Sequence, residues 1–177
     1  WDYALGDYLE VAGWLQQLQA AGKIAQLGAT NFDTPRLVEL ADAGIQLAAH
    51  QVQFSALDHR PEGGPASMST FCDANGLALV CYGSLAGGFL SDRHLGRPAP
   101  TPPLDNRSLV KYRLIIDEYG GWDRFQALLE ALREIADAHA ASIAQIAVAY
   151  ALTRPAVTCV FVGASSSVRI LAGARAT

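Results

Sequence analysis

Apolar side chains recur every three to four residues along several stretches of the chain, which is the spacing of amphipathic helices. One stretch starts at Tyr8, and another begins where Thr34 can cap a helix with Pro35 at its first position. Ser142 and Gln145 have the spacing of a capping box. The pattern predicts helices over about residues 8–21, 34–43, 66–75, 125–136 and 142–154, and a further helix starting at residues 165–167.

Short, almost wholly apolar runs separate these helices. They predict strands over about residues 24–28, 47–53, 77–82 and 157–162, with residues 1–3 as a candidate tail of a fifth. Strands that alternate with helices form parallel sheets, so the predicted fold class is α/β. No Gly-x-Gly-x-x-Gly follows a strand, which weighs against a Rossmann domain. The strand spacing fits an incomplete (β/α)8 TIM barrel better than a flavodoxin-like sheet.

The length of the chain suggests which part of a barrel it forms. A whole (β/α)8 barrel needs roughly 250 residues, and this chain has 177. We therefore expect residues 1–177 to be a single partial domain, the C-terminal half of the barrel with about strands five to eight and their helices, the first half being absent. Position 1 is Trp and not Met, so we interpret it as an internal residue of a longer chain.

The charge balance excludes some partners. The chain carries 13 basic and 17 acidic side chains, a net charge of −4, whereas nucleic acids and anionic membranes are bound by basic surfaces. No apolar run approaches the roughly 20 residues that cross a bilayer, and no signal segment opens the chain. Cys72, Cys81 and Cys159 are interpreted as buried, reduced thiols. We expect a cytoplasmic protein that binds neither nucleic acid nor membrane.

Polar and aromatic groups that follow the predicted strands are the candidates for chemistry, because the active sites of parallel barrels lie at the carboxyl ends of their strands. Asn31 and Gln51 are amides at adjacent strand ends. Such a pair is suited to a carboxamide ligand, and satisfied loop caps are the alternative. Tyr82 ends an apolar strand, where its ring could stack on a flat heteroaromatic ligand or simply fill the rim of the barrel.

Two segments have features of anion sites. Gly83, Gly87 and Gly88 allow backbone amides to approach a ligand closely, although a glycine turn without a ligand fits the pattern as well. Ser165–Ser167 at a predicted helix start, followed by Arg169, could surround a phosphate or form a capped helix with a solvated arginine. The sequence leaves both alternatives open.

Other ionisable groups point to no chemistry. The four histidines have no metal-ligand spacing, so no metal site is expected. Asp58, His59 and Arg60 lie together in a polar, turn-rich segment, and we expect them to form a solvated charge cluster.

Four ordered segments resemble motifs of the aldo-keto reductase family. Gly22–Phe32 is similar to its G-K-I-R-x-x-G-x-S-N-F segment, Gln51–Asp58 to its Q-V-x-Y-S-x-L-x segment, and Tyr82–Leu90 to its Y-S-P-L-A-x-G-x-L segment. Residues 143–152 with 155–163 resemble its final helix, strand and phosphate loop. The resemblance implies a (β/α)8 barrel that reduces carbonyl compounds with NADPH.

Carried over position by position, the resemblance implies that Asn31 and Gln51 bind the nicotinamide carboxamide and that Tyr82 stacks on the nicotinamide ring. Ser84, Leu85 and Gly87 would line the pyrophosphate. The residues around the adenosine 2′-phosphate would be Gly163, Ala164, Ser165 and Arg169. Many members have a cation at the position of Ala164, so the choice of NADP over NAD rests on Arg169 and the serines.

The family's catalytic Asp, Tyr, Lys and His precede the positions that this chain covers, so we expect no catalytic residue in the chain and no activity of the chain alone. The sequence favours an NADP-dependent oxidoreductase that reduces small aldehydes or ketones, with this chain as its cofactor-binding half. Two alternatives stay open. One is a non-catalytic regulatory subunit resembling the potassium-channel β-subunits, and the other is an inactive half-barrel fragment.

Overall fold

The computed structural model of the chain describes residues 7–63 and 67–163. The chain divides into two compact units. Unit 1 comprises Trp1–Val52, Pro61–Val80 and Pro155–Cys159, and unit 2 comprises Gln53–Arg60, Cys81–Arg154 and Val160–Thr177. The sequence-based prediction of a single partial domain stays a prediction.

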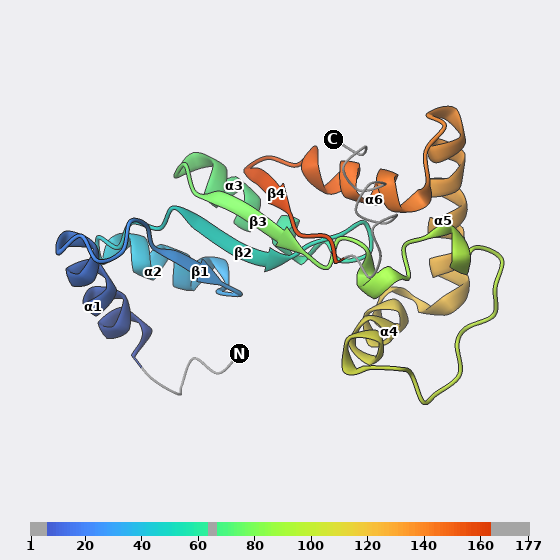
Figure 1. Cartoon of the computed structure of the whole chain (residues 1–177), viewed down its shortest axis with the longest axis horizontal. Helices are drawn as coiled ribbons and strands as arrows, with labels where there is room; N and C mark the ends of the chain where they lie inside the picture. Colours follow the sequence, from blue (N-terminus) through green and yellow to red (C-terminus); the bar gives the residue numbers. More distant parts are fainter. Residues whose placement is uncertain (1–6, 64–66, 164–177) are drawn as a thin grey trace. The chain divides into compact units, whose positions relative to one another are not determined.

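Helices and strands alternate along the chain up to residue 82, and three successive helices then precede the last strand (Figure 1). The helices are α1 (Tyr8–Ala20), α2 (Thr34–Asp42), α3 (Met68–Ala74), α4 (Arg107–Tyr119), α5 (Gly121–Ala138) and α6 (Ile143–Leu152). The strands are β1 (Gly28–Thr30), β2 (Ala49–Gln53), β3 (Ala78–Tyr82) and β4 (Val157–Val160). They form one sheet in the order β1-β2-β3-β4, in which β1 and β2 are parallel. The predicted α/β class with a parallel sheet is confirmed, and the half-barrel stays a prediction.

The first predicted strand is displaced in the structure. Residues 24–27 precede β1, which starts at Gly28. Leu27 is buried and Ile24 is partly buried in a cluster that includes Ala12, Leu40 and Ile45. The apolar pattern of residues 24–27 therefore comes from packing in the core of unit 1, and these residues do not form a strand. The predicted tail of a fifth strand and the helix start at residues 165–167 lie outside the described residues.

The helix caps follow local chemistry, with one correction. The N-cap of α2 is Asp33 and not Thr34, because the Asp33 carboxylate accepts a hydrogen bond of 3.0 Å from the backbone N–H of Arg36. The capping box of α6 is confirmed, since the Ser142 hydroxyl accepts from the Gln145 N–H and the Gln145 side chain accepts from the Ser142 N–H. Helix α4 is absent from the predicted elements.

Helix α1 lies where the apolar spacing places it, but several of its apolar side chains are exposed. Ala12 is buried, whereas Val11, Leu15 and Leu18 are 46%, 39% and 45% exposed. Trp14 on the same helix is 54% exposed. Within unit 1, the helix therefore presents an uncovered apolar surface.

His50 on β2 is fully buried in unit 1. Its Nε2 lies 3.1 Å from the carbonyl oxygen of Phe32, and because a carbonyl only accepts, Nε2 carries the hydrogen. Burial lowers the pKa of His50 below the ordinary value of 6.5, and hydrogen bonding to backbone carbonyls opposes this effect.

We expect the free energy of unfolding to fall as the pH drops below about 6.5. The lowered pKa means that the unfolded chain takes up a proton at a pH where folded His50 stays neutral. The contribution of His50 to the free energy of unfolding is therefore complete above the pKa of histidine in the unfolded chain. It is lost as the pH falls toward the lower pKa of His50 in the folded chain. Urea denaturation at a series of pH values should show a shallower decline for His50→Gln, whereas the exposed His139→Gln should keep the wild-type profile. Identical profiles for both variants would contradict the assignment to His50.

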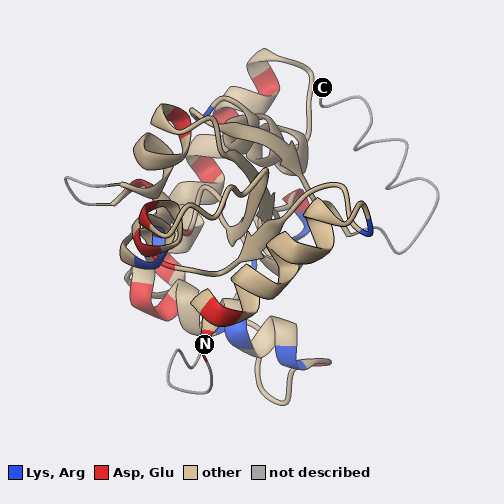
Figure 2. Cartoon of the chain, turned by 90° about the vertical axis from the view of Figure 1, so that its left-hand side faces the viewer, with Lys and Arg blue, Asp and Glu red and all other residues tan. Residues whose placement is uncertain are grey.

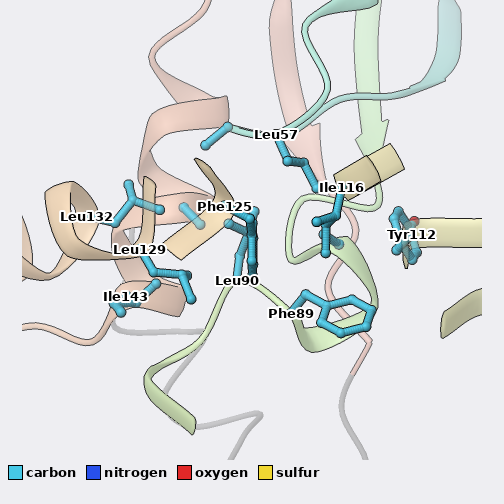
Figure 3. Packing of buried hydrophobic residues seen from close by; sticks show 12 residues of the cluster. Leu57, Phe89, Leu90, Tyr112, Ile116, Phe125, Leu129, Leu132 and Ile143 are labelled. Atoms are coloured by element: carbon cyan, nitrogen blue, oxygen red, sulfur yellow. The ribbon is translucent and has the colours of Figure 1, made fainter. Parts of the chain in front are cut away.

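Unit 2 is organised around one large apolar cluster (Figure 3). Helix α5 contributes Phe125, Leu129 and Leu132, which meet Ile143 from α6. The turn after β3 adds Phe89 and Leu90, and α4 adds Tyr112 and Ile116. The cluster therefore holds the segment after β3 against three helices, and this segment carries the candidate site.

No single helix in the described part of the chain is both long and apolar enough to cross a membrane. Helices α5 and α6 pass that test only when they are taken together, and they are bent by 91° at the break between them. Phe125, Leu129 and Leu132 of α5 and Ile143 and Ala147 of α6 are buried in the core of unit 2.

Candidate functional site

In unit 1, Asn31 directly follows β1 and Gln51 lies on the neighbouring strand β2. The Asn31 N–H donates a 2.9 Å hydrogen bond to the Gln51 carbonyl oxygen, and the Thr30 hydroxyl donates to the same oxygen at 3.2 Å. Asn31 has φ 58°, a left-handed conformation that Asn tolerates better than most residues. Both residues are half-buried. The structure thus brings together the amide pair that the sequence singles out.

In unit 2, β3 ends at Tyr82 and the chain enters a glycine-rich turn. Gly83 has φ 73°, Gly87 has φ 67° and Gly88 has φ 99°. A Cβ atom on Gly83 would lie 2.3 Å from Tyr112 Oη, and one on Gly87 would lie 2.8 Å from Tyr112 Cδ2. Two of the glycines are therefore required for the close approach of the α4 tyrosine as well as for their backbone conformation.

This turn borders a cavity of about 520 Å³ that lies within unit 2. Four of the predicted cofactor residues line it: Ser84, Leu85, Gly87 and Gly163. The Ser84 side chain is buried, and its hydroxyl has no hydrogen-bond partner among the described residues. The predicted phosphate-site residues Ala164, Ser165 and Arg169 lie outside the described residues.

A cationic side chain that the sequence analysis missed also lines the cavity. Arg93 lines it, with Nη2 only 3.5 Å from the point that a Cβ on Gly88 would occupy. No carboxylate within the described ranges forms an ion pair with Arg93. A basic residue shortly after the glycine turn was the available signal, but only the fold shows that it faces the same cavity.

The neighbouring carboxylate is already neutralised. Asp92 forms an ion pair with Arg133 of α5, and its second oxygen accepts a 3.2 Å hydrogen bond from the Ile143 N–H at the start of α6. Charged residues are elsewhere dispersed over several helices, with neutral stretches between them (Figure 2). Arg93 therefore brings a positive charge to the cavity that Ser84 also lines.

Asp58 departs from the prediction of a solvated cluster. It is 5% exposed, and Arg60 donates to its carboxylate at 2.8 and 2.6 Å. The Gln53 Nε2 also donates to it at 2.6 Å. Burial acts to raise the pKa of Asp58, but the hydrogen bonds from Arg60 and Gln53 outweigh it and hold the pKa below its ordinary value. Asp58 is buried instead of solvated because the loop after β2 folds inward within unit 2.

Side chains capable of holding a metal do not gather in the described ranges, where no group of three or more His, Cys, Asp or Glu has that arrangement. All three cysteines are free thiols. Cys72 and Cys81 are buried, but Cys159 is exposed, which corrects the prediction for that residue. Burial raises the pKa of Cys72 to about 11.

The fold and the motifs around the glycine turn define a class of protein, and the chain belongs to the aldo/keto reductase family. The model of that family matches residues 1–177, which confirms the resemblance of the sequence motifs.

Two relatives from other organisms are similar to parts of the chain. The chain is 30% identical over 158 residues to flagellar radial spoke protein 5 of Chlamydomonas reinhardtii, with 78% of this chain and 29% of the relative covered. It is 32% identical over 83 residues to an uncharacterized oxidoreductase of Schizosaccharomyces pombe, with 46% of this chain and 28% of the relative covered.

Solved structures show the same fold. An aldo-keto reductase from Bacillus halodurans matches with a TM-score of 0.67 and 24% identity, over 97% of this chain and 52% of that protein. An aldo/keto reductase from Klebsiella pneumoniae in complex with NADP and acetate matches with a TM-score of 0.62 and 22% identity, over 97% of this chain and 50% of that protein. The chain spans about half the length of these solved structures.

Proposed function

We propose that the chain is the cofactor-binding, C-terminal half of a (β/α)8 barrel in an NADP-dependent oxidoreductase that reduces aldehydes or ketones. The observation that carries the proposal is the cavity beside the glycine turn, which is lined by Arg93 and by Ser84, whose buried hydroxyl has no partner among the described residues. An anionic pyrophosphate matches both groups, because it accepts hydrogen bonds and carries negative charge. The Klebsiella pneumoniae relative, which was solved with NADP, supports this choice of ligand.

Each predicted contact has a place in the proposal. Ser84, Leu85 and Gly87 line the pyrophosphate together with Arg93, which the sequence analysis lacked. Tyr82 at the end of β3 stacks on the nicotinamide ring. The nicotinamide of the bound cofactor supplies the hydride.

Two further parts of the proposal rest on the family resemblance. In unit 1, Asn31 and Gln51 bind the carboxamide, for which their amide groups have the required donors and acceptors. The residues Gly163, Ala164, Ser165 and Arg169 surround the 2′-phosphate, and Arg169 makes NADP the preferred cofactor over NAD.

The half-barrel proposal has independent support. The chain spans 50–52% of the solved relatives cited above. The exposed apolar residues of α1 fit a helix whose neighbours come from the other half of the barrel. In this proposal the substrate is a small-molecule carbonyl compound, and the catalytic groups come from the other half of the barrel.

One observation favours a second candidate function. The relative from Chlamydomonas reinhardtii is a flagellar radial spoke protein, which suggests that the family's fold also serves as a component of an assembly. The chain would then belong to a non-catalytic subunit. With the proposed first half restored, NADPH oxidation that depends on an added aldehyde supports the reductase, and NADPH binding without oxidation supports the second candidate.

Arg93→Gln should weaken NADPH binding by about tenfold, because charge-assisted hydrogen bonds contribute about 1.5–3 kcal/mol and part of that is screened. Titration of the purified chain, followed by NADPH fluorescence, measures the effect, and inorganic pyrophosphate should compete. Arg97→Gln is the matched control, since Arg97 is exposed and does not line the cavity. Equal affinities for the wild type and the Arg93 variant would remove Arg93 and the cavity from the proposal.

A further inference from the structure

Lys111 of α4 holds its ammonium group beside two aromatic rings of unit 2. The Nζ atom lies 4.3 Å from the ring centroid of Tyr112 and 5.4 Å from that of Tyr82. It donates a 2.7 Å hydrogen bond to Gln53 Oε1. The residue as a whole is exposed, so its position comes from these contacts and not from enclosure. An ammonium has three N–H donors, and the neutral Gln53 oxygen accepts from only one of them.

Gln53 is itself fixed by charge. Its Nε2 donates to the buried carboxylate of Asp58 at 2.6 Å, which orients its Oε1 toward Lys111. Asp58 in turn accepts two hydrogen bonds from Arg60. Arg60 therefore neutralises the negative charge of Asp58. The Lys111 ammonium, in contrast, is hydrogen-bonded to the neutral side-chain amide of Gln53.

The charge of Lys111 is therefore not neutralised locally. No carboxylate in the described part of the chain lies within ion-pair distance of its ammonium. Partial burial lowers the pKa of Lys111, and the nearby Arg60 lowers it further while Asp58 opposes them. A bound anion would relieve this excess of positive charge.

The position of Lys111 separates it from the proposed pyrophosphate cavity. Arg93 lines that cavity and Lys111 does not. Tyr112 belongs to the cavity wall, and its ring also contacts the Lys111 ammonium. An anion at Lys111 is thus a second anionic group, which lies next to Tyr82 and outside the lining of the proposed pyrophosphate cavity.

We propose that Lys111 binds a carboxylate of the substrate, so that the carbonyl compounds reduced by the complete protein are oxo acids and not neutral aldehydes. This inference rests on the proposed function, in which Tyr82 stacks on the nicotinamide and the substrate carbonyl approaches that ring. An ammonium is a compact point charge that suits a small carboxylate, and the adjacent aromatic faces stabilise the cation. Lys111 is then a specificity-determining residue.

The chain offers a direct test, because it contains only two lysines, Lys23 and Lys111. Protein labelled with ¹³C and ¹⁵N in lysine is titrated with 4-carboxybenzaldehyde, in the presence and absence of NADP, and followed through the Nζ and Cε resonances. The Lys111 signal should shift and saturate, whereas the Lys23 signal should stay in place. The uncharged methyl ester of the same aldehyde should produce no saturable shift of either signal.

Variants quantify the contact. Lys111→Gln should weaken binding of 4-carboxybenzaldehyde by about five- to tenfold by calorimetry, and Lys111→Arg should recover most of the affinity because it keeps the charge. Lys23→Gln is the matched control for the loss of one positive charge and should bind like the wild type. Circular dichroism melting checks that each variant is folded.

The outcomes separate this inference from the proposed function. Equal binding of acid and ester, or unchanged affinity in a folded Lys111→Gln variant, would overturn the role of Lys111. In that case NADPH titration of the same samples still reports on the cofactor site. If the wild-type chain does not bind NADPH but the Lys111 resonances still shift and saturate with the acid, the proposed function is overturned. A carboxylate site at Lys111 then remains.

Discussion

Phe125→Ala should lower the free energy of unfolding of unit 2 by about 3–5 kcal/mol, the range for removing a large aromatic side chain from a core. The Phe125 side chain is completely buried, and its ring centroid lies 5.1 Å from that of Trp122 and 6.3 Å from that of Phe89. The substitution removes both aromatic contacts and leaves a cavity where α5 meets the turn after β3. Chemical denaturation followed by tryptophan fluorescence measures the loss, because Trp122 adjoins the site.

The matched control lies on the same helix. Ile135 of α5 is 47% exposed, so Ile135→Ala removes a large apolar side chain without opening a buried cavity. We expect a change within about 0.5 kcal/mol. Similar losses for both variants would mean that the face of α5 that carries Phe125 is not the buried one.

Gly83→Ala should destabilise the turn after Tyr82 by about 2–5 kcal/mol, the sum of two penalties. A left-handed backbone costs a residue with a Cβ atom about 1–2 kcal/mol, and overpacking adds about 1–3 kcal/mol. At Gly83 both penalties act, since φ is 73° and the new Cβ would lie 2.3 Å from Tyr112 Oη. The turn would have to move away from α4, so NADPH binding should weaken together with the melting temperature.

Two further variants isolate the causes. Gly13→Ala is the control for the substitution itself, because nothing lies within 4 Å of the new Cβ in α1. It should stabilise the helix by about 0.5–1 kcal/mol. Tyr112→Phe removes the nearest atom, so the double variant with Gly83→Ala should recover part of the loss. Strictly additive effects of the two changes would show that Tyr112 does not limit the space at Gly83.

Local sequence chemistry determined most of the secondary structure. The capping box at Ser142 forms as predicted because its two hydrogen bonds join residues three positions apart. The same local character explains why Asp33 displaced Thr34 as a cap, since neighbouring residues compete for the same N–H groups. The family resemblance also came from sequence alone, because the motifs around Asn31, Gln51 and Tyr82 are short and continuous.

Only the tertiary structure decided which apolar and charged groups are buried. Leu27 packs in a core instead of extending a strand, and Asp58 lies buried beside Gln53 rather than in solvent. Arg93 and Lys111 reach the region of the glycine turn from segments that no motif marks. The physical reason is that hydrophobic periodicity reports spacing along one element, whereas burial and ion pairing depend on contacts between residues distant in sequence, such as Gln53 and Lys111, that only packing brings together.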